Sequence, residues 1–509
     1  MQEPRGSDCV VKRRVYNALG QVTPPIRNVV LVTPEAEPFY RKGGLGNVCG
    51  ELAAALSRAG LTTHLVTGWY ESMQANPPPC IEGGVSCSVA IGPRKYDMSV
   101  LRGVYNGVTH CFLSIPGLIR EAYEGSSPLD FALALCEGAF RAIESMVHLG
   151  LMERPDILHA HDWPTALVPV FLRAKYGNNP VFQQTASVLT VHNAKHMGGW
   201  IPGHRFPELG ISGEHWPNLE QPGEPDKFCL LRGGVRYAHK LNAVSRTNRE
   251  EMLTPFGGFG LERDYLERAN DFAGIVNGIS YDEWPSITPE DKARAKTELQ
   301  KQFGFECRKQ IPLLGMVARI DKQKGVKLAA AVIGRLLERT KGGLQFVYLG
   351  QGHPMDPYAV ETSASLDMLA QRWPRNVRFV RSYSTAEQKA VFRAIDIFLY
   401  PSEFEPCGTR PVVALRHRVP CVVTRTGGLA DNFTEYNPIT GEGNGWLLEA
   451  PREDELERAI ERALALFKQR KHWARITANA AAADHSWDRP VHEYIRLYAE
   501  AAETARNKR

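Results

Sequence analysis

The stretch "IRNVVLVTPE" (residues 26–35) decides the fold class. Its uninterrupted apolar run is typical of a strand that is buried on both faces of a sheet. After a glycine loop, residues 47–60 repeat apolar side chains at helical spacing, and Gly60 ends that helix. A second strand is predicted over residues 62–68. The order strand, helix, strand predicts a βαβ unit at the start of the fold.

The same alternation continues along the chain and restarts in its second half. No short-period repeat is present. The pattern predicts an α/β protein with two Rossmann-like, doubly wound domains of similar size that face a cleft. The further predicted strands cover residues 156–162, 187–193, 311–320, 344–352, 376–383, 396–402 and 420–428.

Local breaks in regular structure set the predicted boundaries. Asn277-Gly278 and Pro285 break regular structure between the first and the second series of predicted strands and helices. An amphipathic helix is expected from Pro490 onward. The predicted divisions are an N-terminal extension (1–25), a first Rossmann-like domain (26–276), a hinge (277–285), a second Rossmann-like domain (286–485) and a C-terminal helix (486–509) that packs back on the first domain.

Composition excludes several classes of protein. The 509 residues are 43% apolar, and no run approaches the roughly 18 apolar residues of a membrane span. The net charge is +5, without a dense basic block, so no nucleic-acid partner is predicted. The ten cysteines show no CxxC pair and no Cys/His metal spacing, which predicts a reducing compartment and neither a metal nor another cofactor. We expect a cytoplasmic protein, or one of the plastid stroma in a eukaryote.

Basic side chains and glycines follow two of the predicted strands. Arg319 and Lys324 come after the strand over 311–320, where two cations would suit a diphosphate. A solvated basic loop is the alternative. Gly43 and Gly44 precede a helix, so their backbone amides are candidates for a phosphate site, although most such turns are only turns.

An acid and a histidine stand at two other strand ends. Glu405 lies in "EFEPCGTRPVV" (residues 403–413), just before a helix start that attracts anions. Simple helix capping is the alternative. His161, at the end of "LHAHD", is a candidate hydrogen-bond donor to a sugar, or else a satisfied structural histidine. The chain contains neither a P-loop nor a GxSxG nucleophile elbow.

Eight motifs together resemble the bacterial glycogen synthases and plant starch synthases, a family of retaining transferases with the GT-B fold. The resemblance covers roughly residues 29–498, and the motifs occur in the family's order. They are "GGLGNV", "HAHDW", "TVHN", "IVNGISYDEW", "ARIDKQKG", "SEFEPCG", "RTGGLAD" and "HSWDR".

On the donor side, the resemblance implies a complete set of residues. Arg319 and Lys324 would stabilise the departing diphosphate, Glu405 would hold the transferred glucose, and His161 would bind that glucose near the reacting carbon. Tyr383 would stack near the base. The remaining expected donor-binding residues are Gly43, Gly44, Gly350, Gly352, Cys407, Gly408, Thr409, Thr426 and Gly427.

On the acceptor side, the chain departs from the family pattern. Arg41 stands where lysine is expected, and Asn47 replaces an aspartate. His196 and Met197 replace a Tyr-Gln pair. In "CLLR", Cys229 and Arg232 replace an asparagine and a lysine. His192 and Asn193 keep the family's residues, so the expected acceptor side comprises Arg41, Asn47, His192, Asn193, His196 and Cys229.

The resemblance implies metal-independent transfer of glucose, with retention, to an α-1,4-glucan or a related acceptor. ADP-glucose is the favoured donor, and UDP-glucose is second. Two alternatives stay open: a transferase of the same family with a non-glucan acceptor, and a non-catalytic glucan- or nucleotide-binding relative. Intact Arg319, Lys324 and Glu405 count against the second alternative. The sequence leaves the oligomeric state open.

Overall fold

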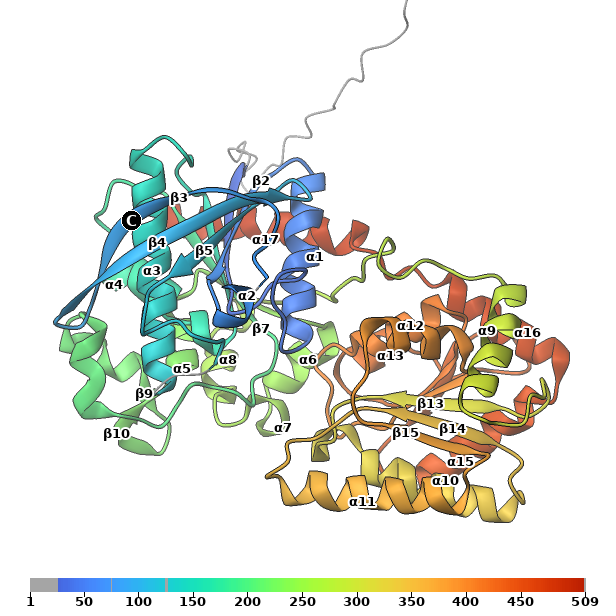
Figure 1. Ribbon diagram of the computed structural model, residues 1–509. Coiled ribbons are helices and arrows are strands. Elements are labelled where there is room, and N and C mark those ends of the chain that lie inside the picture. Colours follow the sequence, from blue (N-terminus) through green and yellow to red (C-terminus); the bar gives the residue numbers. More distant parts are fainter. Residues whose placement is uncertain (1–25, 75, 124–126, 508–509) are drawn as a thin grey trace, which may run out of the picture.

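The computed structural model describes residues 26–74, 76–123 and 127–507. The predicted extension over 1–25 and the last two residues of the predicted C-terminal segment lie outside this part. The described chain forms two α/β domains that lie side by side (Figure 1), one built on a nine-stranded sheet and the other on a six-stranded sheet. The predicted fold class is therefore confirmed. None of the helices in the described part is long and apolar enough to cross a membrane.

The N-terminal sheet is parallel except at one edge. Its strand order is β12 (Phe272–Gly274), β11 (Lys240–Ala243), β7 (Ala186–Val191), β6 (Ile157–His161), β1 (Asn28–Val32), β2 (Thr62–Gly68), β5 (Val108–Ser114), β4 (Arg94–Tyr105) and β3 (Ile81–Ile91). All five residues of β1 are buried, as expected for a central strand covered on both faces.

Eight helices of the N-terminal domain connect or cover these strands in the described residues. Among them, α1 follows the glycine loop and leads into β2, which completes the predicted βαβ unit. The eight are α1 (Gly44–Arg58), α2 (Glu71–Gln74), α3 (Pro128–His148), α4 (Leu167–Ala174), α5 (Leu230–Tyr237), α6 (Arg246–Met252), α7 (Pro255–Gly258) and α8 (Glu262–Glu267).

The antiparallel edge of this sheet was not predicted from the sequence. Strand β3 pairs antiparallel with β4, and β4 with β5, so a long hairpin extends the parallel core. A small separate sheet, β8 (Ile201–Pro202), β10 (Glu224–Phe228) and β9 (Glu220–Gln221), was also not predicted.

The C-terminal sheet is parallel throughout. Its order is β15 (Val377–Val380), β14 (Gln345–Leu349), β13 (Leu313–Val317), β16 (Ile397–Tyr400), β17 (Cys421–Thr424) and β18 (Gly445–Leu448). Its helices are α9 (Pro289–Gln302), α10 (Val326–Arg339), α11 (Pro357–Arg372), α12 (Thr385–Ala394), α13 (Thr409–Arg416), α14 (Gly427–Asn432), α15 (Glu453–Phe467) and α16 (Arg470–Ala482).

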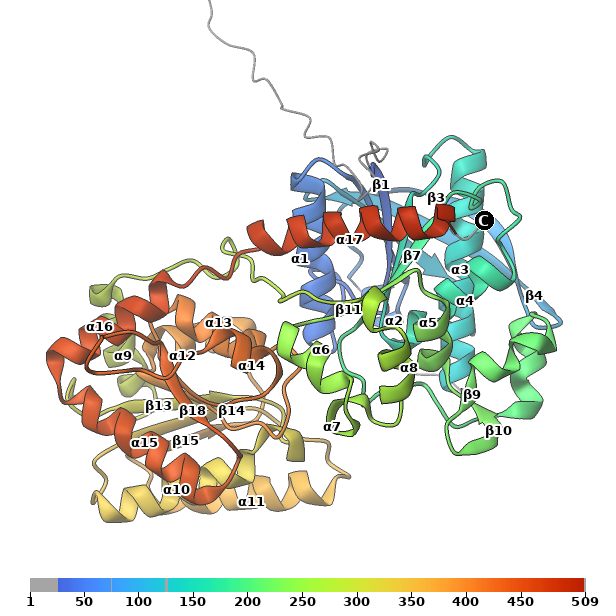
Figure 2. The same ribbon diagram turned by 180° about the vertical axis from the view of Figure 1, so that it is seen from behind.

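The final helix, α17 (Asp488–Asn507), lies on the N-terminal domain (Figure 2). Its apolar face, including Tyr494 and Tyr498, joins a buried cluster with β1 and α1. Two segments therefore connect the domains, and they touch closely: a Cβ atom at Gly278 would lie 2.7 Å from the Ser486 carbonyl oxygen.

A carboxyl group on α1 is hydrogen-bonded to the second of these connecting segments. The indole Nε1 of Trp487 donates to Glu51 Oε2 at 2.7 Å. Burial raises the pKa of Glu51 to about 7, against the opposing effect of this hydrogen bond.

Candidate functional site

The predicted site residues lie where the order of each sheet reverses. In the C-terminal sheet, the connections change direction between β13 and β16; in the N-terminal sheet, they change between β1 and β6. Open α/β sheets bind ligands beyond the carboxyl ends of their strands at such switch points. Lys324 and Glu405 follow β13 and β16, while Gly43 follows β1 and His161 ends β6. The topology therefore brings both halves of the predicted site to the expected edges.

Lys324 and Glu405 form a buried ion pair. Lys324 Nζ lies 2.6 Å from Glu405 Oε2, and the two side chains are only 9% and 10% exposed. Ser402 Oγ donates to the same carboxylate oxygen at 3.2 Å, and the Tyr400 ring lies beneath the ammonium group at 5.4 Å. Burial acts to lower the pKa of Lys324, but Glu405 raises it, and the net shift is upward. The lysine is therefore charged at neutral pH.

Arg319 is placed differently from Lys324. Its side chain is 69% exposed and lies 3.6 Å from Asp321. Gly350 and Gly352 lie against this segment: Cβ atoms there would come within 1.8 Å of the Ala318 oxygen and 2.7 Å of the Ile320 oxygen, respectively. Close packing beside Arg319 is thus sufficient to explain both glycines.

The loop that carries Glu405 is locked to the turn before α14. A Cβ atom at Gly427 would lie 2.1 Å from the Glu405 carbonyl oxygen, so only glycine fits there. Gly408 has a left-handed φ of 77° and precedes Thr409, the first residue of α13. No side chain caps this helix start. The first amides of α13 are thus not satisfied by a cap and face the region of Glu405, which suits an anion.

Arg410 belongs to this site, although the sequence analysis quoted it without singling it out. It is the second residue of α13 and hydrogen-bonds to Tyr400. Burial acts to lower its pKa, but Tyr400, Tyr383 and Glu405 raise it, and the net shift is upward. A second cation, in addition to Lys324, therefore stands near Glu405. Its position two residues after Gly408, in the first helical turn, was the available signal.

In the N-terminal domain, a buried acid organises the glycine loop. Glu35 Oε2 accepts from the backbone amides of Lys42 at 2.6 Å and Gly43 at 2.8 Å. Tyr123 Oη donates to the other carboxylate oxygen at 2.5 Å. The Gly43 amide, expected to meet phosphate, is therefore already bonded. Gly44 begins α1, which has no side-chain cap, and a Cβ atom there would meet nothing within 4 Å.

His161 is buried and paired with a second predicted residue. Its Nδ1 lies 3.0 Å from His192 Nε2, and its backbone amide donates to Thr165 Oγ1 at 2.6 Å. Burial lowers the pKa of His161 well below its usual value and that of His192 to about 3. Both imidazoles are therefore neutral at physiological pH.

Asp162 joins the ends of β6 and β7. It adopts a left-handed φ of 59°, and its Oδ1 accepts from the amides of His192 at 2.5 Å and Asn193 at 3.3 Å. Burial raises the pKa of Asp162 to about 7, against these hydrogen bonds. A strained, half-buried aspartate therefore fixes the backbone that carries the predicted sugar and acceptor residues.

The predicted acceptor side divides into exposed and buried positions. Arg41 Nη1 lies 3.0 Å from Glu37 and 3.5 Å from Asn47 Oδ1, at the surface before α1. His196 is exposed and lies near Arg319 of the other domain, whose charge helps to lower its pKa after the larger effect of burial. These three positions are open to an acceptor.

Cys229 corrects the sequence expectation. It has no exposed surface; its Sγ accepts from the Arg232 amide at 3.5 Å and donates to the Met197 oxygen at the same distance. Met197 is likewise buried. Cys229 thus caps α5 and packs against the Met197 loop, and does not face a substrate. Cys229 differs from Asn47 in that its side chain is fully buried, which the sequence does not reveal.

Contacts between the domains bring these loops together. Ser245 Oγ donates to the Pro406 oxygen at 2.7 Å. Glu251 Oε1 accepts from Thr426 Oγ1 at 2.8 Å and from the Gly427 amide at 2.9 Å. The two groups expected beside the phosphates are therefore bonded to an N-terminal-domain carboxylate in this arrangement.

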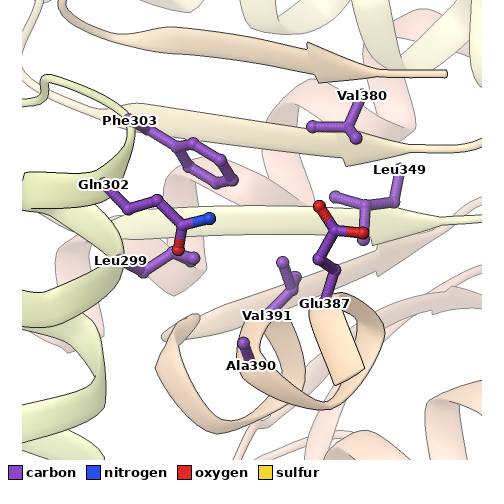
Figure 3. A pocket seen from close by; sticks show the side chains of 8 residues that line it. All are labelled: Leu299, Gln302, Phe303, Leu349, Val380, Glu387, Ala390 and Val391. Carbon is purple, nitrogen blue, oxygen red and sulfur yellow. The ribbon is translucent and has the colours of Figure 1, made fainter. Parts of the chain in front are cut away.

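A small pocket elsewhere in the C-terminal domain is not a candidate. It lies between α9, α12 and the sheet (Figure 3), where Phe303, Leu349 and Val391 face Glu387. Its volume of about 20 Å³ accommodates little more than one water molecule. A nucleotide sugar does not fit there.

Comparisons with known proteins agree with this geometry. Residues 28–267 match the family model described as starch synthase catalytic domain, and residues 298–480 match glycosyl transferases group 1. A protein named glycogen synthase 2 from Geobacter sulfurreducens is 32% identical, and the match covers 94% of this chain and 99% of that protein. A glycogen synthase from Clostridium beijerinckii is 34% identical over 93% of this chain and 98% of its own.

Solved structures match over similar lengths. The catalytic domain of starch synthase IV from Arabidopsis thaliana, bound to ADP and acarbose, superimposes with a TM-score of 0.84 at 26% identity, over 94% of this chain and 100% of that one. Sucrose-phosphate synthase from Thermosynechococcus elongatus matches with a TM-score of 0.61 at 16% identity, over 93% of this chain and 98% of its own. The second match bears on the two-domain fold alone.

Proposed function

Because this chain belongs to the glycogen and starch synthase family of glycosyltransferases, we propose that it transfers glucose, with retention, from ADP-glucose to the end of an α-1,4-glucan or a related acceptor. The family makes it a nucleotide-sugar glycosyltransferase with a carbohydrate acceptor. The identity of the donor, the stereochemistry and the choice of acceptor are the parts that we propose.

The observation that carries the proposal is the buried Lys324–Glu405 pair beside the uncapped start of α13. A leaving diphosphate gains negative charge as its bond to the sugar breaks, while the sugar carbon gains positive charge. Lys324, Arg319 and the α13 amides oppose the first charge, and Glu405 opposes the second. One site thus stabilises both charges of a separating ion pair.

The proposed transfer proceeds on one face of the sugar. The bond between the sugar C1 and the diphosphate oxygen breaks, and the electron pair leaves with the diphosphate. The acceptor hydroxyl oxygen then bonds to C1 from the same side, and its proton passes to a diphosphate oxygen. His161, neutral and held by His192, would orient the glucose through a hydrogen bond. Cationic side chains stabilise the diphosphate in this scheme, so no step calls on a metal ion.

ADP-glucose is favoured over UDP-glucose by the likeness to a starch synthase whose solved structure holds ADP. We propose that Tyr383, which is half-buried and packs against the C-terminal core, stacks near the base. For the cell, we propose the cytoplasm, or the plastid stroma of a eukaryote. The nine described cysteines are all unpaired, as a reducing compartment requires.

A second candidate keeps this donor chemistry but uses another hydroxyl acceptor. It is favoured by the exposed Arg41 and His196 and the half-buried Asn47, which differ from the family pattern. Each unmatched hydroxyl of a buried glucan end would cost roughly 1–3 kcal/mol. An arginine fork also differs from a lysine point charge in the hydrogen bonds that it offers.

One experiment tests both candidates. The enzyme is incubated with ADP-glucose or UDP-glucose and with maltoheptaose or simple sugars, and products are identified by mass spectrometry. A ladder of lengthened maltooligosaccharides from ADP-glucose supports the first candidate; a single glucosylated small acceptor supports the second. Glu405→Gln is the control, because a product that persists in this variant does not come from the proposed site. No product from any pair would refute the proposal.

A further inference from the structure

Three residues of metal-ligand type meet behind the predicted sugar site. Cys49 on α1, His161 at the end of β6 and His192 just after β7 each offer one ligand atom, and these atoms all lie within 4.8 Å of one another. Cys49 and His161 have no exposed surface, whereas His192 is partly exposed. The cluster is thus buried but has one side toward solvent. Sequence spacing gives no sign of it, because adjacent strands and a helix bring the three together.

The distances are close to those of a metal site. A tetrahedral ion with bonds of about 2.0 Å to nitrogen and 2.3 Å to sulfur places two nitrogen ligands and one sulfur ligand roughly 3.3–3.5 Å apart. His161 Nδ1 and His192 Nε2 are 3.0 Å apart, so they need to separate only slightly to hold an ion between them. Side-chain shifts of about 1 Å bring the thiol to the same ion.

Independent features also favour a ligand here. The Asp162 carboxyl group, which accepts from the His192 amide at 2.5 Å, places an acid beside the cluster. Thr33 Oγ1 lies 3.3 Å from Cys49 Sγ and helps to orient the thiol. Outer groups of this kind orient metal ligands.

We propose that Cys49, His161 and His192 form a binding site for a soft divalent cation such as Zn²⁺, and that the bound ion blocks sugar transfer. On binding, the Cys49 thiol releases one proton to solvent, and its thiolate sulfur bonds to the ion. The two neutral imidazoles each donate a lone pair, and water fills the fourth position. No oxidation or reduction takes place. The block rests on the proposed function, since the ion would occupy the space between His161 and His192, the pair that is proposed to orient the glucose; the binding itself does not.

Direct binding is tested with Co²⁺ as a coloured substitute for Zn²⁺. The full chain is stripped with EDTA and titrated with Co²⁺, and its absorption is recorded. We expect one equivalent to give the visible bands of tetrahedral cobalt and a thiolate-to-cobalt charge-transfer band. Cys49→Val should lose the charge-transfer band and bind at least about a hundredfold more weakly. Cys307→Ser, which removes an exposed thiol, and Cys421→Val, which removes a buried one, should keep both.

Measurements of transferase activity distinguish binding of the ion from inhibition by the bound ion. One equivalent of Zn²⁺ should reduce glucose transfer at least about tenfold, and EDTA should restore it. The ratio of rates with and without Zn²⁺ should be near one in Cys49→Val. If this variant does not fold, as judged by circular dichroism, loss of cobalt binding in His192→Phe takes its place as the supporting result.

Several outcomes would overturn the proposal. Absence of the thiolate band in the wild-type chain, or its survival in Cys49→Val, removes the site. Tight binding with undiminished transfer removes the block while the site stands. Because the cobalt spectrum does not depend on turnover, a chain that lacks transferase activity still tests the site.

Discussion

Lys324 and Arg319 offer a matched pair of variants that separates catalysis from stability. Both cations are proposed to stabilise the leaving diphosphate. Lys324 is buried against Glu405 at 2.6 Å, whereas the Arg319 side chain is 69% exposed. Truncating either one should therefore slow the reaction, but only one truncation should weaken the fold.

The expected magnitudes follow from this difference. Lys324→Ala leaves the Glu405 carboxylate buried without its partner, which lowers the free energy of unfolding by about 3–5 kcal/mol. Arg319→Ala removes an exposed side chain, so its effect on unfolding stays within about 0.5 kcal/mol. In the transition state, each loss of about 3 kcal/mol would lower kcat roughly two orders of magnitude. Donor affinity should fall much less, because the charge on the phosphate grows only as the bond breaks.

Three measurements check these expectations. The rate of ADP release from ADP-glucose gives kcat, calorimetry gives donor affinity, and urea unfolding followed by circular dichroism gives stability. The double variant Lys324→Ala/Glu405→Gln removes both charges at once, so it should be more stable than the sum of the losses in Lys324→Ala and Glu405→Gln predicts. A folded Lys324→Ala enzyme with wild-type kcat would refute the phosphate role. Additive stability losses in the double variant would refute the coupling of the pair.

Three further predictions concern the donor site and the hinge. Arg410→Ala should weaken ADP binding measured by calorimetry by roughly tenfold or more, and Arg410→Lys should recover part of it; equal affinity in all three forms would contradict the placement of Arg410. Saturating ADP should reduce the radius of gyration measured by small-angle scattering, because we expect the two domains to close around the nucleotide about residues 277–281. Closure would also exclude water from the site. An unchanged radius would count against this motion. The pKa of Glu51 is raised to about 7 in the folded state, so between about pH 4.5 and 7 the folded state holds a proton that the unfolded state has lost. The contribution of Glu51 to the free energy of unfolding therefore falls by up to about 3 kcal/mol as pH rises through this range. Glu51→Gln keeps an oxygen for Trp487 Nε1 and should be more stable than wild type at pH 8; a wild-type pH profile in this variant would show that another group titrates.

The parallel core was predictable because its strands carry simple apolar runs. Segments 26–35 and 62–68 read as buried strands, and they form β1 and β2. The antiparallel edge was missed for a physical reason: β3 is exposed over much of its length, so polar residues and glycines interrupt its apolar residues and no continuous apolar run forms. Val85 and Val89 do recur at even spacing, and "GPR" (residues 92–94) marks the hairpin, so an alternation search would have found it.

For the functional site, the rule that ligands bind beyond the carboxyl ends of the strands located candidate residues but not the groups that they contact. It placed Lys324 and Glu405 near one another because both follow strands at a switch point. It did not reveal that Glu251 bonds to Gly427, or that Cys49 meets His161, because these contacts depend on how separate elements pack. It overlooked Arg410 because it considers only strand ends, whereas Arg410 lies in the first turn of α13.

The acceptor side narrows to fewer positions than the sequence indicated. Cys229 is a buried helix cap, so its difference from the family's asparagine does not bear on the acceptor directly. Arg41, Asn47 and His196 remain, and the first two contact each other. Arg41→Lys/Asn47→Asp restores the family pair and should raise the rate of maltoheptaose extension relative to other acceptors. Cys229→Asn is the matched control: asparagine also caps helices, so fold and acceptor use should be unchanged. If Cys229→Asn raised the rate of maltoheptaose extension and Arg41→Lys/Asn47→Asp did not, the difference in acceptor use would come from the buried Cys229 and not from Arg41 and Asn47.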